Sequence, residues 1–284
     1  MFGNFLNLKN KLTLAKVLRS LDESLPRKIE ISKFGEFYKC YAYDSEKIAG
    51  SMSPSVHAGS SKVKEIAILK ALSEYYERKA VYASDFKYTN GAAAQPVLFS
   101  RSKALKIAKK RSFMDALERY AFYRWFDNYN IQHQMIAQKS ITLAELSNKL
   151  GAFRSGCFRI SLEDDAHLIV SFLDLKNGVI FGLACDSSRL LAFERSLSEL
   201  IENAMCFKAM NRNNINEQES EILNLAYNGK KFLRRVYDTL GREPVPKARI
   251  IKSEELKYEF SKEIAVYRTI IEKRIYSKSQ LSGS

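Results

Sequence analysis

Pairs of acidic residues three positions apart recur in this sequence, each pair inside a run of apolar residues. The pairs are Glu74 and Glu77, Asp115 and Glu118, and Glu199 and Glu202. On a helix, residues three apart lie on one face, so each pair places two carboxylates side by side. Because like charges so placed destabilise a helix, the pattern indicates a cationic partner, most simply a hydrated divalent metal.

A plainer interpretation of each pair is a solvent-exposed helix face. Arg78 and Arg119 directly follow the second acid of the first two pairs and could neutralise acids on their own helix. Charged residues lie mostly at the surface, so this interpretation is the stronger one for any single pair. The repetition of the pair, with aromatic or large apolar residues around it, favours a shared function instead.

Three helices must position these acids, and the spacing of apolar residues predicts them at about 64–83, 102–128 and 189–211. Alternating residues on both sides of Gly35 predict a hairpin, and β-branched segments joined by short turns predict three further strands. The predicted strands are 28–33, 36–43, 157–162, 167–175 and 178–185.

The remaining segments complete the expected organisation. They are a helix at 1–23, a loop at 51–61, a turn at 90–91, a helix at 142–150, a helix at 217–240, a strand at 248–251 and a final helix ending near 276. Thr142 is the expected N-cap of its helix, and Glu145 completes a capping box. Helices intermixed with grouped hairpins predict an α+β protein. We divide it into an N-terminal helix and β-hairpin at 1–50, a core at 51–211 and a helical C-terminal extension at 212–284.

The composition limits the class of protein. The 284 residues are 46% hydrophobic and 27% charged, as in ordinary globular proteins. No apolar run approaches the roughly 20 residues that a membrane helix needs, and the first residues lack a secretory signal, so we expect a cytoplasmic protein. The net charge of +14 attracts polyanions, but the basic residues are scattered and no nucleic-acid-binding motif is present.

The other residues that often carry out chemistry, the cysteines and histidines, form no recognisable site. The four cysteines and three histidines show no C-x-x-C or other ligand spacing, which argues against a structural zinc site and a disulfide framework. Phe122, Tyr123, Trp125 and Phe126 could form a peptide-binding platform, but their spacing is more typical of a buried core.

The three acid-pair segments resemble the YcaO family. Residues 67–78 read Ala-Ile-Leu-Lys-Ala-Leu-Ser-Glu-Tyr-Tyr-Glu-Arg, similar to the family's Ala-x-x-Ser-Ala-Leu-x-Glu-x-x-Glu-Arg helix. The second segment has the family's Asn-Gly-x-Ala turn at 90–93, then Asp-Ala-Leu-Glu-Arg at 115–119 and a downstream Trp125. Residues 192–199 resemble its Ala-x-x-Arg-Ala-Leu-x-Glu segment. The resemblance covers about residues 50–210 and implies a YcaO-like nucleotide-binding core, its acid-pair helices packed on antiparallel β-sheet.

The resemblance implies an ATP-dependent peptide-modifying enzyme, a cyclodehydratase in its azoline-forming members. YcaO proteins bind ATP and Mg²⁺ through the acidic helices and phosphorylate a backbone amide oxygen of a ribosomally made precursor peptide. A neighbouring side chain then replaces the oxygen to give a thiazole- or oxazole-type azoline, or external sulfide gives a thioamide. The family also implies a partner protein that delivers the peptide, and homodimers are common in it. The chemistry is physically sound because Mg²⁺ neutralises the transferring phosphoryl group and prefers oxygen ligands.

The family's nucleotide-binding positions carry over to this sequence residue by residue. The implied nucleotide-binding residues are Lys62, Glu74, Glu77, Arg78, Asp115, Glu118, Arg119, Glu199 and Glu202. The implied metal ligands among them are Glu74, Glu77, Asp115, Glu118 and Glu199. The resemblance leaves the catalytic residues unassigned.

Departures from the family pattern leave two interpretations open. Lys70 and Arg111 replace small nucleotide-facing residues with long cations, and Asp115 stands where Glu is usual. The two cations could contact phosphate, or they could block the nucleotide site. The retained acids favour an active enzyme, whereas the substitutions favour a non-catalytic scaffold or substrate-binding partner. A basic nucleic-acid-binding protein is a third class, and it leaves the acid pairs unexplained.

Overall fold

The computed structural model describes most of the chain, with gaps. The described residues are 14–15, 18, 26, 28–43, 56–82, 90–97, 100–128, 130–137, 140–176, 178–210, 229–237, 241–257 and 264–271. Of the helix predicted at 1–23, only Leu14, Ala15 and Leu18 fall within these ranges, and they are helical. No helix in the described ranges is long and apolar enough to cross a membrane.

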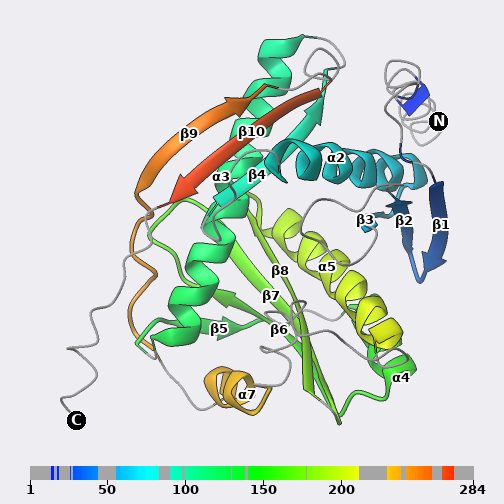
Figure 1. The fold of residues 1–284 in the computed structure, drawn as a ribbon. Helices are drawn as coiled ribbons and strands as arrows, with labels where there is room; N and C mark the ends of the chain where they lie inside the picture. Colours follow the sequence, from blue (N-terminus) through cyan, green and yellow to red (C-terminus); the bar gives the residue numbers. More distant parts are fainter. Residues whose placement is uncertain are drawn as a thin grey trace, which may run out of the picture.

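The first structural unit packs helix α2 (Lys64–Tyr82) on the antiparallel sheet β1-β2-β3 (Figure 1). β1 (Lys28–Phe34) and β2 (Phe37–Tyr43) form the predicted hairpin, in which Gly35 takes a φ of 54° that L-residues rarely adopt. β3 (Val56–Ser61) corrects the loop predicted at 51–61, of which residues 51–55 lie outside the described ranges. Its small, polar residues look loop-like, but they pair antiparallel with β2.

The second unit packs helix α3 (Arg101–Asp127) on the sheet β4-β10-β9. β4 (Asn90–Pro96) begins at the predicted Asn-Gly turn, which is therefore wrong, and the alanines that follow are strand residues despite their low β-propensity. β9 (Ile250–Leu256) lengthens the predicted strand at 248–251. β10 (Ile264–Ile271) contradicts the predicted final helix.

The strand β10 lies at the centre of its sheet, between β4 and β9. Its β-branched residues suit a buried central strand, and Arg268 pairs across the sheet with Glu254, so the charge within the strand is neutralised. Residues 212–284 are therefore more than a helical extension, because β10 completes the sheet beneath α3. The helix predicted at 217–240 is present as α7 (Gly229–Tyr237), and its other residues lie outside the described ranges.

The third unit packs helix α5 (Arg189–Met210) on the antiparallel sheet β5-β6-β7-β8. The strands are β5 (His133–Met135), β6 (Arg154–Ile160), β7 (His167–Leu175) and β8 (Gly178–Asp186). Helix α4 (Ile141–Leu150) precedes β6 and is capped by Ser140, whose hydroxyl accepts from the Leu143 amide. The predicted N-cap, Thr142, lies inside the helix and donates its hydroxyl to Glu36 instead.

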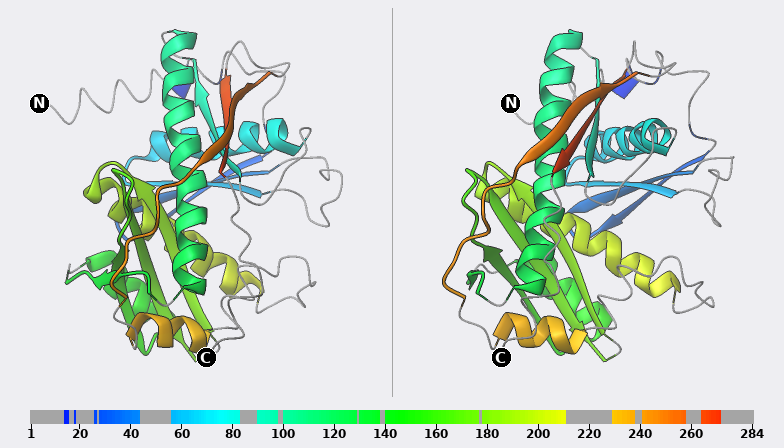
Figure 2. Two further views of the ribbon diagram at one scale, coloured as in Figure 1. Left: turned by 90° about the vertical axis from the view of Figure 1, so that its left-hand side faces the viewer. Right: turned by 60° about the vertical axis from the view of Figure 1, so that its left-hand side comes forward.

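Helix α3 joins the second and third units. It runs along the sheet β4-β10-β9 in its first half and reaches β6 and β8 further on (Figure 2). Its last turns bury Phe122, Trp125 and Phe126 in a core shared with β6, β7, β8 and α7, so these aromatics are core residues as predicted. Arg235 of α7 closes this end of α3 by donating to the carbonyls of Trp125, Asn128 and Ile131.

These units confirm the predicted α+β class. In the described part of the chain the strands form three antiparallel sheets, and each sheet carries one acid-pair helix.

Candidate functional site

A cavity of about 570 Å³ lies where α2, α3 and α5 approach one another, beside residues of β3, β4 and β8. Every predicted site residue except Lys62 lines it. They are Glu74, Glu77 and Arg78 from α2, Asp115, Glu118 and Arg119 from α3, and Glu199 and Glu202 from α5. Lys62 lies elsewhere, half-exposed between Glu36 and Glu194, with Nζ–O distances of 3.3 and 3.1 Å.

Glycines bring one strand of each sheet against its helix. A Cβ at Gly59 would lie 2.2 Å from the Ala67 carbonyl oxygen, and one at Gly182 would lie 2.3 Å from that of Ser196. Gly91 has the same relation to α3, at 2.0 Å from the carbonyl of Ser112. Only a residue without a side chain permits such close approach of two backbones. The strand amides are thereby placed within reach of acids on the helices.

Three of the cavity acids accept hydrogen bonds from strand amides. Glu74 accepts from the Ala58 amide at 2.8 Å, and Asp115 accepts from the Ala92 amide at 3.1 Å. The other oxygen of each acid faces the arginine four residues later, Arg78 or Arg119, at 3.4 Å. Both oxygens of Glu74 and of Asp115 therefore already have partners within the protein.

Glu118 is held between helix and strand as well. Its Oε2 accepts from the Cys185 amide of β8 at 2.9 Å. Burial raises the pKa of Glu118 to about 7, and the charge of Asp115 contributes to this shift. The hydrogen bond from the Cys185 amide opposes it. Among the described residues its Oε1 accepts no hydrogen bond, so this oxygen is available to a ligand.

The remaining acids, Glu77, Glu199 and Glu202, accept no hydrogen bond from the part of the chain that the structure describes. Burial raises the pKa of Glu77 to about 8, and the charge of Asp115 adds to the shift. Burial also raises the pKa of Glu202 to about 7. The pKa of Glu199 lies well above its ordinary value because of burial and the nearby charges of Glu118 and Glu202. Nearby cations, Arg78 at Glu77, Arg195 at Glu199 and Lys39 at Glu202, offset the cost of burying the ionised form only in part.

Three further cations line the cavity. Lys70 of α2 donates to the Ser60 carbonyl at 2.7 Å, and Arg111 of α3 donates to Gln95 at 3.1 Å. Arg195 of α5, which was not among the predicted site residues, is the third. A sequence signal for Arg195 exists, because each of the three cations precedes the first acid of its pair by four residues.

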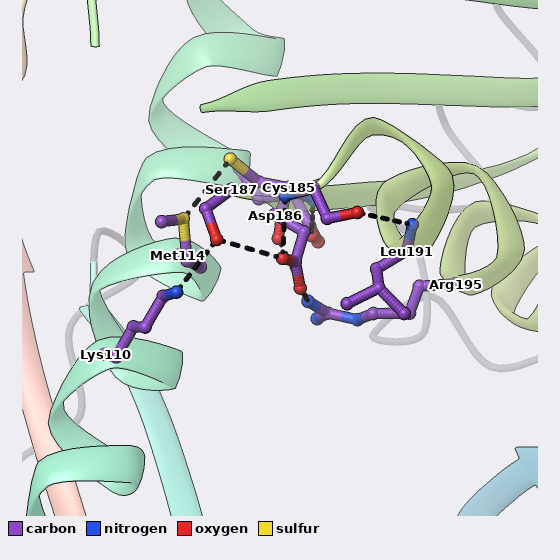
Figure 3. A network of polar contacts seen from close by, with 9 residues as sticks. Lys110, Met114, Cys185, Asp186, Ser187, Leu191 and Arg195 are labelled. Atoms are coloured by element: carbon purple, nitrogen blue, oxygen red, sulfur yellow. Dashed lines mark hydrogen bonds and ion pairs between the residues drawn. The ribbon is translucent and has the colours of Figure 1, made fainter. Parts of the chain in front are cut away.

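The Arg195 side chain is fixed at the end of β8. Figure 3 shows its guanidinium near Cys185 and Asp186, and it donates to the Cys185 carbonyl at 3.0 Å and to Asp186 Oδ2 at 3.2 Å. Asp186 Oδ1 accepts from Ser187, whose hydroxyl also accepts from Lys110 of α3 at 2.8 Å. This network ties α3, β8 and α5 together at one edge of the cavity.

The acids do not form a ready-made metal cage. In the described ranges, no three histidine, cysteine or acidic side chains are grouped so that they could hold a metal ion by themselves. Any ion bound in the cavity would therefore take part of its coordination from a ligand or from water. Tyr123, expected in the core, is 42% exposed and lines the cavity.

No protein-family model matches this chain, and no curated protein matches it. Solved structures do match. YcaO from Methanopyrus kandleri, bound with AMPPCP and Mg²⁺, is 14% identical with a TM-score of 0.63, and the alignment covers 92% of this chain and 90% of that one. A chain of the E. coli microcin synthetase McbBCD complex with pro-MccB17 bound is 12% identical, with a TM-score of 0.58 and coverage of 87% and 88%.

A heterocyclase in complex with substrate and cofactor is 9% identical with a TM-score of 0.55. The alignment covers 91% of this chain but 52% of the heterocyclase, so this chain spans about half of that protein's length. At these identities the likeness concerns the fold alone. The chain has a YcaO-like fold, which confirms the expected architecture.

Proposed function

We propose that this chain is a divergent YcaO protein that uses ATP and Mg²⁺ to phosphorylate a backbone amide oxygen of a ribosomally made peptide, leading to an azoline or a thioamide. The observation that carries the proposal is the convergence of acid pairs from three repeated helices in one cavity. The likeness in fold to a YcaO structure bound with AMPPCP and Mg²⁺ supports the same assignment.

The cavity suits a metal-bound triphosphate. Its volume, about 570 Å³, falls in the usual range for small-molecule sites. Its described lining holds both signs of charge, with six carboxylates and the cations Lys70, Arg78, Arg111, Arg119 and Arg195. The carboxylates could take part in binding a divalent metal, and the cations could meet phosphate oxygens.

The acids differ in how available they are to a metal. Glu77, Glu199 and the free Oε1 of Glu118 are the preferred ligands in this proposal, because a divalent cation would supply the positive charge that their ionised forms lack. Glu74 and Asp115 are also proposed ligands, but their oxygens are engaged by strand amides and arginines. Mg²⁺ in nucleotide sites takes few protein ligands, and phosphate and water complete its coordination.

Bound magnesium would neutralise charge on the transferring phosphoryl group. The protein's part is to hold the reactants in place. Hydrogen bonds from strand amides to Glu74, Asp115 and Glu118 fix the helices against the strands, so the acids are organised before a ligand arrives. Phosphorylation must precede departure of the amide oxygen, since that oxygen is otherwise a very poor leaving group.

The substrate and its delivery belong to the proposal too. We propose a ribosomally made precursor peptide as substrate and a partner protein that presents it. The support is that one matched microcin synthetase structure is a complex with pro-MccB17 bound.

A second candidate function is a non-catalytic scaffold with the same fold. The observation that favours it is the presence of Lys70 and Arg111 in the cavity, where two long cations could occupy the space of a nucleotide. The two candidates differ in whether the folded protein binds Mg-ATP.

Thermal unfolding with and without Mg-ATP tests the proposal. A ligand that binds only the folded state at one hundred times its Kd adds about 2.7 kcal/mol to stability, which raises Tm by several degrees. We expect this stabilisation in the native protein and its loss in Glu77→Gln and Glu118→Gln. Glu65→Gln is the matched control, because Glu65 lies on α2 but outside the cavity lining, and it should respond as the native protein does.

The peptide step needs its own readout. Incubation with candidate precursor peptides and Mg-ATP should change peptide mass, by loss of water for an azoline or by exchange of oxygen for sulfur for a thioamide. Stabilisation by Mg-ATP without ADP formation, with any peptide or partner, would favour the scaffold. No stabilisation at millimolar Mg-ATP would overturn the enzyme proposal.

A further inference from the structure

The cation that precedes each acid pair recurs at one position of the three-helix repeat. Lys70, Arg111 and Arg195 stand four residues before Glu74, Asp115 and Glu199, respectively. Four residues make about one helical turn, so the cations lie one turn closer to the N-terminus of each helix than the acids do. All three line the same cavity from three different helices. The repeat therefore supplies a layer of cations beside a layer of acids.

The acids of the pairs do not neutralise these cations through their own helices. Glu74 and Asp115 pair with the arginines that follow them, Arg78 and Arg119, which is the more favourable order along a helix. Lys70 and Arg111 donate instead to uncharged oxygens, those of Ser60 and Gln95. Because an ammonium carries three donors and a guanidinium five, each retains donors beyond these bonds.

The three cations also influence one another electrostatically. Burial lowers the pKa of Lys70 to about 8, and the charges of Arg195 and Arg111 oppose the attraction of Glu202. Burial, together with the charge of Arg195, also lowers the pKa of Arg111. At Arg195 burial acts in the same direction, but Glu118 and Asp186 outweigh it and raise the pKa, so this charge is retained. The three cations thus act on one another through the cavity.

We propose that Lys70, Arg111 and Arg195 form a polyphosphate-binding layer that holds a triphosphate chain directly, without a divalent metal. A triphosphate matches the layer because its oxygens are spread along a short chain and can meet cations from three helices at once. An arginine guanidinium can also bind two phosphate oxygens at once through two parallel N–H···O hydrogen bonds. Lys70 and Arg111, which depart from the family pattern, thereby gain a binding role.

This inference rests on the proposed function in one respect, that the triphosphate is the nucleotide's, yet it predicts separate behaviour. Binding should persist when all divalent metal is removed. We would measure binding of sodium tripolyphosphate, ATP and AMP to the full chain by calorimetry in EDTA. Tripolyphosphate and ATP should bind and AMP should bind far more weakly. A free inorganic polyphosphate site would favour tripolyphosphate strongly over ATP, whereas a nucleotide site would not.

Charge-matched variants separate the layer from the general basicity of a protein with net charge +14. Lys70→Met, Arg111→Met and Arg195→Met should each weaken tripolyphosphate binding in EDTA by about 10- to 100-fold, as expected for loss of a charged hydrogen bond. Lys106→Met and Arg189→Met remove one exposed charge from α3 and α5 outside the cavity and should change binding less than about twofold. If Arg195→Met fails to fold, Arg195→Lys and Arg111→Met still test the layer.

The outcomes distinguish this inference from the proposed function. Absence of tripolyphosphate binding in EDTA, or equal loss in the control variants, would overturn the layer even if Mg-ATP stabilises the protein. Binding in EDTA that depends on Lys70 and Arg111, in a protein that Mg-ATP stabilises no more than ATP alone and that Glu77→Gln leaves unaffected, would support the layer and contradict the magnesium-dependent proposal.

Discussion

The acid pair on α5 differs from the pairs on α2 and α3 in what holds it. Glu74 and Asp115 each accept a hydrogen bond from a strand amide and face an arginine four residues later. In the described ranges, neither Glu199 nor Glu202 accepts a hydrogen bond, and both have raised pKa values. The three helices share one pattern in sequence, yet the protein neutralises only part of it internally.

A single position accounts for much of this difference. α5 carries Asn203 where α2 and α3 carry Arg78 and Arg119. Asn203 donates to the Phe181 carbonyl of β8 at 2.8 Å, so it secures the helix to the strand without supplying a charge. Acids repeated at one spacing can therefore have different roles. Glu74, Asp115 and Glu118 organise the site, whereas Glu199 and Glu202, like Glu77, leave their oxygens available to a ligand.

The largest expected effect comes from breaking the strand contact that places the third pair. In Gly182→Ala the new Cβ would lie 2.2 Å from the Leu200 amide nitrogen, so α5 must move away from β8. We expect a loss of about 3 kcal/mol or more in free energy of unfolding, measured by urea denaturation. Gly229→Ala, where the nearest atom is 3.1 Å away, should cost much less. Equal losses would contradict the close-approach argument.

A pH titration should separate the compensated acids from the uncompensated ones. The raised pKa values of Glu77, about 8, and Glu202, about 7, mean that near pH 7 the folded protein holds protons that the unfolded chain has released. Stability should therefore fall as pH rises from about 6.5 to 8, by about 1 kcal/mol per pH unit for each such proton. The lowered pKa of His133 acts in the opposite direction below this window, and the lowered pKa of Lys70, about 8, does so at its upper end.

Variants make this titration specific to the two kinds of acid. Glu202→Gln removes one of the retained protons and should flatten the dependence on pH, as measured by urea unfolding at pH 6.5, 7.25 and 8. Asp115→Asn should lower stability by about 1–2 kcal/mol already at pH 6.5, because it weakens the bonds to the Ala92 amide and to Arg119. Loss of its charge should also flatten the dependence on pH, because that charge helps to raise the pKa values of Glu77 and Glu118. Stability that increases through this window in the native protein would contradict the interpretation.

The smallest expected effect comes from making α5 resemble the other helices. Asn203→Arg supplies Glu199 with an arginine four residues later, at the position that Arg78 and Arg119 hold on their own helices. Such pairs contribute about 0.3–0.5 kcal/mol, and loss of the bond to Phe181 opposes the gain. We expect little net change in Tm but a weaker effect of Mg²⁺ on Tm, because Glu199 would have a partner already. Arg119→Asn should have the converse effect, and an unchanged response in both would count against the comparison.

The sequence allowed the acid-pair helices and most strands to be predicted because their signals are local. Helical spacing around Glu74, Asp115 and Glu199 gave the three helices nearly to their ends. The strands β3 and β4 were not predicted because they contain small residues, such as Gly59 and Gly91. These residues allow close contact with a helix but have low strand propensity. Strand β10 was missed because one of its two partners, β4, lies far away in the sequence.

The acids of the site could be predicted because the same spacing recurs in three helices. Lys62 was assigned only by resemblance to a family position, and the structure places it beside Glu36 and Glu194, outside the cavity. The roles of Lys70, Arg111 and Arg195 depend on three helices meeting in space, which spacing within one helix does not reveal. The cap at Ser140 rather than Thr142 was a smaller miss, because both hydroxyls suit an N-cap.

The central position of β10 sets an order of events while the chain is being made. As the polypeptide leaves the ribosome, β4 emerges long before β10, the strand with which it pairs. The sheet beneath α3 must wait for that partner, whereas β1 to β3 and β5 to β8 can pair with neighbours already synthesised. Since Ala92 of β4 holds Asp115, the cavity acquires its final form late in translation, and a nascent chain stalled before β10 would lack a finished site.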